Sequence, residues 1–148
     1  MPADRSYVAK NDAARQRLEK LVASCSDAEL AHPMPAGWTV AAVLAHVAFW
    51  DSRIELLVDR WLTQNVPPPA IFDDFDWIND AAKPMQLAVS PRKAAELTVA
   101  GAQTVDRMLQ GLSDDMVGRI VQSKALSLDR AEHRNEHLDE IEHALRRK

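Results

Sequence analysis

The chain has 148 residues, a formal net charge of −4, 47% hydrophobic residues and 27% charged residues, which predicts one globular domain over residues 1–148 and disfavours a nucleic-acid-binding protein. Its only cysteine, Cys25, excludes an internal disulfide and favours a cytoplasmic protein. The polar N-terminus lacks the apolar core of a secretion signal, and the longest apolar run, residues 40–50, is too short to span a membrane.

The first two predicted helices cover about residues 5–25 and 40–64. In both segments apolar residues recur every three or four positions, as they do on the buried face of a helix. Two prolines and a glycine within residues 31–37 separate the two segments. Thr39 is the predicted N-cap of the second helix, because its hydroxyl can accept a hydrogen bond from the first turn.

Residues 65–89 form a long connection that contains three consecutive prolines and the acidic–aromatic stretch FDDFDWIND. We expect a connection of this length to cross over, to carry a short helix at about 72–82, or to line a site. Two roles are open for its aromatic residues Phe72, Phe75 and Trp77. They contribute to the wall of a pocket, or they pin a surface crossover.

The third predicted helix covers about residues 91–110, since a serine–proline pair precedes it and Gly111 follows it. Residues 111–123 are predicted to be a turn and connector, and the fourth helix covers about residues 124–146. Four helices without a convincing strand predict an all-α four-helix bundle. The long connection between the second and third helices favours a crossover topology.

Three histidines carry the most specific chemical signal in the sequence. His133 and His137 are four residues apart in the fourth predicted helix, which places them about 40° apart around its axis. His46 lies at the edge of the apolar stripe of the second predicted helix. Three imidazoles on two facing helices can hold one metal ion and leave coordination positions open. The alternative is that each is an ordinary core histidine that binds no ligand.

The other candidate residues do not indicate a specific site. The motif HRNEH differs from the HExxH of zinc proteases, because Glu136 occupies its fourth position and points away from His133. His143 lies on the solvent side of the helix, about 80° from His133, and His32 lies in the proline-rich loop. Cys25 is interpreted as a buried, inert thiol.

The segments GWTVAAVLAHVAFWDSRI and HRNEHLDEI resemble the second helix and the late histidine motif of the DinB-like (damage-inducible) four-helix bundles. This group includes YfiT-like proteins, regarded as metal-dependent hydrolases, and the metal-binding part of mycothiol-dependent maleylpyruvate isomerase. The resemblance extends over nearly the whole chain, including the FDDFDWINDAA connection and the GLSDDMV turn. It implies that His46, His133 and His137 ligate a divalent metal ion, nickel or zinc, and that the protein is a homodimer.

The resemblance also implies chemistry on a small molecule, because the family is associated with transfer to low-molecular-weight thiols and with hydrolase-like activities. We therefore expect a metal-dependent thiol S-transferase or hydrolase with a small-molecule substrate. The alternatives are a non-catalytic metal- or small-molecule-binding protein with a sequestration or stress-response role, and a bundle without metal. No catalytic residue beyond the three ligands is assigned. The isomerase carries a further C-terminal domain, whereas this sequence ends at Lys148, so we do not expect that specific activity.

Overall fold

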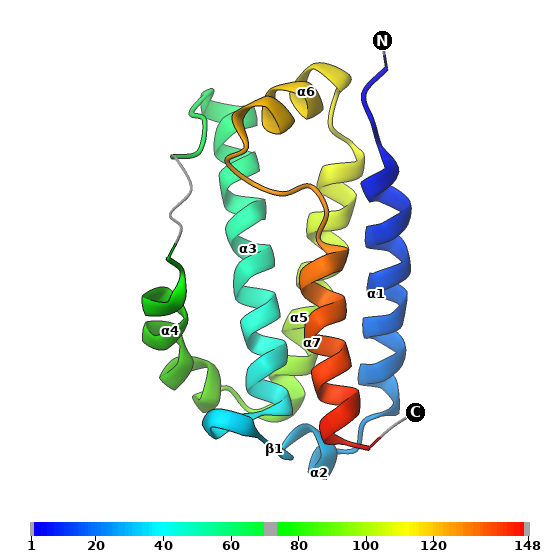
Figure 1. The fold of residues 1–148 in the computed structure, drawn as a ribbon, viewed down its shortest axis with the longest axis vertical. Coiled ribbons are helices and arrows are strands. Elements are labelled where there is room, and N and C mark those ends of the chain that lie inside the picture. The colour runs from blue at the N-terminus through cyan, green and yellow to red at the C-terminus, as the bar shows by residue number, and fades with distance from the viewer. Residues whose placement is uncertain (1, 70–73, 147–148) are drawn as a thin grey trace.

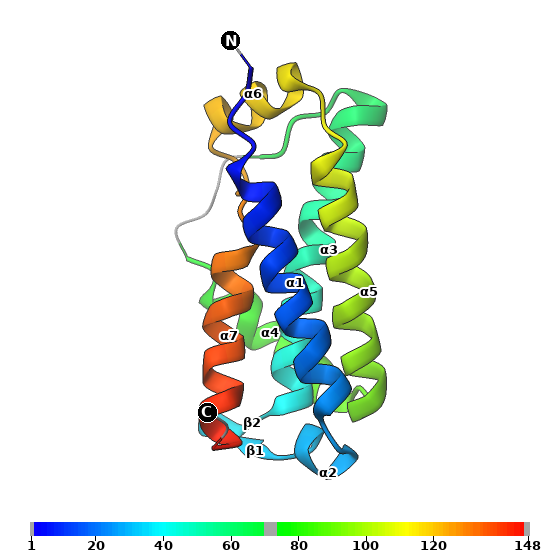
Figure 2. The ribbon, with the colours of Figure 1, turned by 90° about the vertical axis from the view of Figure 1, so that its right-hand side faces the viewer.

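The computed structural model describes residues 2–69 and 74–146 (Figure 1). Helices dominate these residues, which confirms the prediction of a mostly helical protein. None of the described helices combines the length and the hydropathy that a membrane crossing requires. The four longest of them lie side by side: α1 (Ser6–Ser24), α3 (Val40–Gln64), α5 (Pro91–Gln110) and α7 (Ala131–Ala144) (Figures 1 and 2).

These four helices form a closed set of neighbours. α1 packs against α5 and α7, and α3 packs against the same two helices. Figure 1 shows that α3 and α5 run in one direction and that α1 and α7 run in the opposite direction. α3, which carries His46, and α7, which carries His133 and His137, are therefore neighbours in the bundle.

Smaller elements cover the two ends of the long helices. At one end lie α2 (Asp27–Leu30) and two antiparallel strands, β1 (Pro33–Met34) and β2 (Trp38–Thr39), joined by a 3₁₀ turn at Pro35–Gly37. α6 (Asp114–Ser123) covers the opposite end (Figures 1 and 2). The sequence predicted neither α2 nor the strands, because two-residue strands are too short to show an alternating pattern.

Helix boundaries are predicted best where a local capping signal sets them. α3 and α5 begin and end at the predicted residues, and α1 is one residue shorter at each end than predicted. The hydroxyl of Thr39 accepts a hydrogen bond of 3.1 Å from the backbone N–H of Ala42, as expected of an N-cap. Ser90 occupies the N-cap position of α5 but its side chain makes no capping hydrogen bond.

The prediction for residues 111–146 is wrong in two places. Residues 114–123 form α6 instead of a connector, because the hydroxyl of Ser113 caps the first turn through the backbone N–H of Met116 at 3.2 Å. α6 ends at Ser123, and the next residue, Lys124, has a left-handed φ of 55°. α7 begins only at Ala131, where Asn11 of α1 accepts hydrogen bonds from the backbone N–H groups of residues 130 and 131.

The connection between α3 and α5 carries α4 (Asp76–Ala88), which packs against α3. The short helix predicted at 72–82 therefore exists, but it begins later and continues through Pro84 to Ala88. Phe72, one of the three aromatic residues considered for the pocket wall, lies outside the described residues. The Lys83 ammonium donates to the carbonyl of Ala36 in the 3₁₀ turn, so the C-terminal half of α4 contacts the β1–β2 hairpin.

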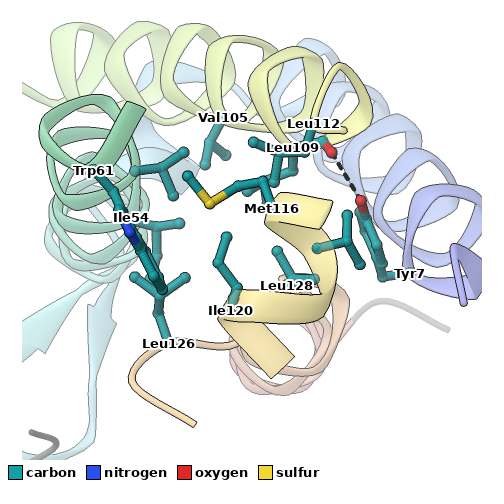
Figure 3. Packing of buried hydrophobic residues seen from close by; sticks show 12 residues of the cluster. Tyr7, Ile54, Trp61, Val105, Leu109, Leu112, Met116, Ile120, Leu126 and Leu128 are labelled. Carbon is teal, nitrogen blue, oxygen red and sulfur yellow. Dashed lines mark hydrogen bonds between the residues drawn. The ribbon is translucent and has the colours of Figure 1, made fainter. Parts of the chain in front are cut away.

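The core contains three apolar clusters, and a polar layer separates the two larger ones. Figure 3 shows the cluster beneath α6, where Tyr7 donates a hydrogen bond of 2.8 Å to the carbonyl of Leu109. The second cluster lies towards the hairpin end and includes Leu18 and Ile141. Between the clusters, the chain places buried polar residues on every long helix: Asn11, Asp51, Asp106 and Arg134.

Candidate metal centre

The three predicted histidines come together between α3 and α7. The Nε2 atom of His133 lies 3.3 Å from Nε2 of His46 and 3.2 Å from Nε2 of His137. The candidate ligand atoms of all three lie within 4.8 Å of one another. His46 is 8% exposed, and the side chain of His137 is 17% exposed, so the cluster is covered on one side and reachable on the other.

The spacing of these nitrogens fits a metal ion. Two nitrogen ligands on a tetrahedral zinc ion with ordinary bond lengths are separated by about 3.3 Å, which is the separation found here. A core histidine that binds nothing normally satisfies both ring nitrogens. In the part of the chain that the structure describes, the buried Nδ1 atoms of His46 and His133 have no hydrogen-bond partner, and ligation of a metal ion through Nε2 would leave both of them unpaired as well. The spacing of the Nε2 atoms is therefore the observation that favours a metal ion.

Burial keeps two of the imidazoles neutral. It lowers the pKa of His46 to about 4, with a smaller contribution from His137. It lowers the pKa of His133 to about 3, with further contributions from His137 and from the cation of Arg130. Near neutral pH both rings therefore carry a free lone pair, which is the form that binds a metal ion.

A carboxylate orients the third histidine. Nδ1 of His137 lies 2.9 Å from Oε2 of Glu140, one turn further along α7. If Nδ1 donates the proton in this contact, Nε2 is left unprotonated and faces the other two rings. Sequence reasoning considered Glu136 and missed Glu140, although the spacing of three residues along the helix was readable.

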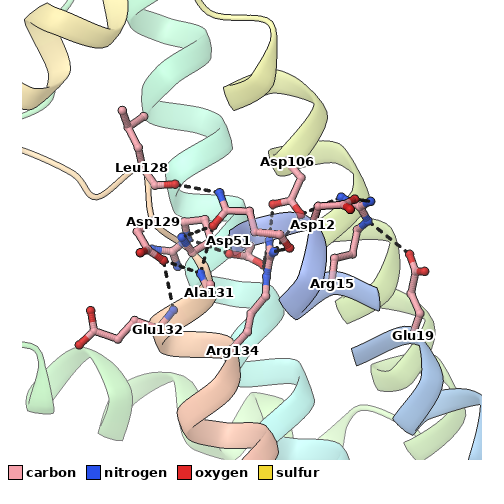
Figure 4. Close-up of polar contacts among 12 residues, drawn as sticks. Asp12, Arg15, Glu19, Asp51, Asp106, Leu128, Asp129, Ala131, Glu132 and Arg134 are labelled. Carbon is pink, nitrogen blue, oxygen red and sulfur yellow. Dashed lines mark hydrogen bonds and ion pairs between the residues drawn. The ribbon is translucent and has the colours of Figure 1, made fainter. Parts of the chain in front are cut away.

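A buried ion network fixes the rotation of α7 (Figure 4). Arg134, between the two histidines, donates to Asp106 on α5 at 2.8 and 2.9 Å and to Asp51 on α3 at 3.2 Å. Arg130 donates to the other oxygen of Asp51 at 3.0 Å. Since His133 is adjacent to Arg134, this network sets the direction in which the histidine points.

Sequence reasoning missed this network. The signal was present, because Arg134 precedes Leu138 by four residues and Ile141 by seven, so all three share one face of the helix. Both leucine and isoleucine are buried, and Arg134 is 1% exposed. A charged residue within an apolar stripe predicts a buried partner of opposite charge, here Asp51 and Asp106.

A comparison with protein-family models identifies the family to which the chain belongs. The family model of the DinB superfamily matches residues 10–141, which include all three histidines. The chain belongs to the DinB superfamily. No curated protein and no solved structure gives a significant match.

The histidines of this DinB protein open into a large pocket, called the first pocket below. Its volume is about 880 Å³, within the range of small-molecule sites. α4 provides Asp76, Asn79 and Asp80 to its lining. The predicted role of the 65–89 connection as a pocket wall is thus supported by α4. The full lining consists of Met34, Pro35, Trp38, Val43, His46, Asp76, Asn79, Asp80, His133, Glu136, His137, Glu140, His143 and Ala144.

The aromatic residues of the connection have unequal roles in this DinB protein. Phe75 packs edge-on against Trp50, with ring centroids 5.2 Å apart. Trp50 also donates a hydrogen bond of 2.9 Å to Asn79 of α4. Trp77 is 60% exposed and lines no pocket described for the chain, so neither of the two roles left open for it finds support at this residue.

The remaining candidate residues lie as the sequence indicated. His143 and His32 are exposed, and Glu136 is exposed as well, although it lines the first pocket. His143 nevertheless contributes to the outer edge of the first pocket, without joining the histidine cluster. Cys25 is buried in the core, in agreement with its interpretation as a structural thiol.

Proposed function

We propose that this DinB-superfamily protein is a four-helix bundle of the DinB/YfiT-like type, with a crossover connection between α3 and α5, that binds one divalent metal ion. His46, His133 and His137 would be the ligands, and zinc or nickel the metal. The convergence of their three Nε2 atoms, with neighbouring separations of 3.2 and 3.3 Å, carries the proposal. The parallel course of α3 and α5 in Figure 1 supports the crossover.

We infer that the activity is that of a metal-dependent thiol S-transferase or hydrolase acting on a small molecule. A metal ion held by three imidazoles supplies a Lewis acid that activates water or a thiol. The other residues of the chain would orient the ligands. Glu140 positions the ring of His137, and the Arg134 network positions α7, the helix that carries His133 and His137. The first pocket has space for a small substrate and a low-molecular-weight thiol as co-substrate.

The test is metal content after loading the metal-free protein with zinc or nickel. Wild-type protein should retain about one equivalent after desalting, because three imidazoles form one open site. The double variant His133→Ala/His137→Ala should retain none. His143→Ala is the matched control, since it changes an exposed histidine on the same helix and should leave the stoichiometry intact. Equal retention by wild type and double variant would refute the site.

One observation favours a non-catalytic binding protein as the second candidate. Of the four carboxylates that line the first pocket, only Glu140 makes a side-chain hydrogen bond or ion pair within the described chain, and its partner is a histidine. A general acid or base needs a fixed position near the substrate. A screen of the zinc- and nickel-loaded protein for thiol conjugation and ester hydrolysis separates the two. Turnover abolished by the double variant indicates an enzyme, and metal binding without turnover indicates sequestration.

We also propose, from the family, that the protein is a homodimer. Exposed apolar side chains on α3, Leu56 and Leu62 among them, are available for such a contact. Sedimentation velocity at micromolar concentration should show a dimer. A single species with the mass of the 16.5 kDa chain would refute the stable dimer.

A further inference from the structure

A second pocket reaches two of the three histidines, His46 and His133. Its volume is about 390 Å³. His46, His133 and Asn79 line both pockets, so a molecule in the second pocket contacts the candidate metal centre. The rest of its lining is mainly apolar and comes from α3, the start of α4 and the segment between α6 and α7: Trp50, Arg53, Ile54, Phe75, Ala125, Leu126, Ser127 and Arg130.

The two pockets differ in the sign of their charge. Four carboxylates line the first pocket, and no lysine or arginine is among its described lining residues. The second pocket is lined by two arginines and, among its described residues, by no aspartate or glutamate. An anionic group is therefore repelled from the first pocket and attracted to the second.

The two arginines of the second pocket are not equivalent. Arg130 is buried and its guanidinium is already paired with Asp51 at 3.0 Å. Arg53 stacks over the ring of Trp50, 5.8 Å from its centroid, and makes no ion pair or hydrogen bond within residues 2–69 and 74–146. Burial and the neighbouring cation of Arg130 both lower the pKa of Arg53, so an anion beside it would be stabilised.

We propose that the second pocket binds a small carboxylic acid, with Arg53 pairing the carboxylate and Trp50, Phe75 and Leu126 enclosing an apolar body. The planar guanidinium matches a carboxylate in two parallel hydrogen bonds. A single unpaired cation suits a monoanion better than a phosphate dianion. The volume of about 390 Å³ suits a body the size of one aromatic ring with a short chain.

This assignment deepens the proposed function, because it makes the apolar carboxylate the substrate class of the metal-dependent reaction. The substrate would extend from Arg53 towards His46 and His133, which lie at the boundary between the two pockets. The end of the molecule remote from the carboxylate would then lie next to the first pocket, where a second small molecule has space to bind.

The test uses three probes with one skeleton: 3-phenylpropanoate, 3-phenylpropanamide and 3-phenylpropylamine. Binding to metal-free wild-type protein is measured by calorimetry and by ligand-observed NMR, so that no carboxylate can ligate a metal ion. The carboxylate should bind at least about tenfold more tightly than the amide, because only the carboxylate forms a charge-assisted pair with arginine. The amine should bind more weakly than either.

Variants assign the effect to Arg53. Arg53→Gln should remove the preference for the carboxylate over the amide, and Arg53→Lys should retain part of it, since lysine keeps the charge without the planar fork. Arg60→Gln is the matched control, because Arg60 is exposed on the same helix and lines neither pocket. If Arg53→Gln does not fold, Arg53→Lys is compared with wild type instead. A reduced preference for the carboxylate over the amide supports the role of Arg53, and an unchanged preference overturns it.

Failure of this inference is distinct from failure of the metal site. Equal binding of carboxylate and amide to wild type, or an unchanged preference in folded Arg53→Gln, overturns the carboxylate site whatever the metal content. Arg53→Gln should retain the wild-type metal stoichiometry, because its side chain is not a ligand. Loss of the carboxylate preference with retained metal supports the inference.

Discussion

Arg134 and Asp106 form a buried, two-point ion pair, with Nη2 to Oδ1 at 2.8 Å and Nη1 to Oδ2 at 2.9 Å. The pair joins α7 to α5 (Figure 4). It lies in the polar layer between the two larger apolar clusters of the core. Arg134 also pairs with Asp51 on α3 and donates to the backbone carbonyl of Asn11 on α1, so one guanidinium connects all four long helices. Because Arg134 follows His133 in the chain, the same contact that ties the helices together also orients a candidate ligand.

Arg134→Met should be strongly destabilising. The methionine is too apolar to pair with Asp51 and Asp106, and breaking a buried pair on one side leaves charge uncompensated, at a cost of about 3 kcal/mol or more. Urea unfolding measures the change. Lys93→Ala is the control, because Lys93 and Glu96 form an exposed pair at 3.6 Å that contributes less than about 1 kcal/mol. Similar losses in both variants would contradict a structural role for the network.

The metal-free protein should become less stable as the pH falls below neutrality. Folding lowers the pKa of His46 to about 4 and that of His133 to about 3, both from an ordinary value of 6.5, so the unfolded chain binds protons more readily. The free energy of unfolding is highest above about pH 6.5. It falls as the pH drops towards the folded-state values, by about 2 kcal/mol for each histidine between pH 7 and pH 5.

Urea unfolding at a series of pH values checks this dependence. The variant His46→Gln/His133→Gln should show a flatter profile over the same interval, since its two side chains do not titrate. Identical slopes for wild type and variant would show that other groups cause the loss.

Glu140→Gln should weaken metal binding without unfolding the protein. The contact of 2.9 Å between Glu140 and Nδ1 of His137 fixes the ring orientation, and loss of such a partner typically costs about tenfold or more in metal affinity. Competition with a chelator measures the affinity. Glu136→Gln removes an equal charge from the lining of the same pocket and should have a smaller effect. Equal effects would indicate that general charge, not orientation, is responsible.

Phe75→Ala and Trp77→Ala should behave differently. Phe75 packs edge-on against Trp50 and lines the second pocket, so its loss should cost about 1 kcal/mol of stability and weaken binding of 3-phenylpropanoate. Trp77 is 60% exposed, and its removal should change neither. Thermal unfolding and calorimetry measure both quantities. A larger loss of stability in Trp77→Ala than in Phe75→Ala would indicate that Trp77 pins the connection to the surface of the bundle.

The sequence predicts the parts of the fold that local patterns control. The apolar repeat and the capping hydroxyl of Thr39 define α3 along its whole length. The start of α7 could not be found in the same way, because Asn11, about 120 residues earlier, accepts the hydrogen bonds of its first turn. A cap supplied by another helix leaves no mark in the neighbouring sequence.

In the candidate site too, some residues could be predicted from local sequence patterns and others could not. The histidines of α7 were readable from their spacing, and His46 from its place on an apolar stripe. The role of Arg53 was not readable, because it depends on Phe75 and on the segment between α6 and α7, which complete the second pocket, and on the absence of a carboxylate from the described lining of that pocket. Pairing among charged side chains is a tertiary property, whereas helical spacing is a local one.

α4 has a consequence for how such a protein can diversify. Gln86 is the only buried residue of this helix, whereas the histidines and the Arg134 network lie on the long helices. Residues 76–88 can therefore tolerate substitution, insertion or shortening with little effect on the core. Because α4 carries three lining residues of the first pocket, such changes would alter which molecules are accepted while the histidine cluster stays the same. Transferring α4 from one related chain to another would transfer the preference for particular small molecules and leave the histidine cluster unchanged.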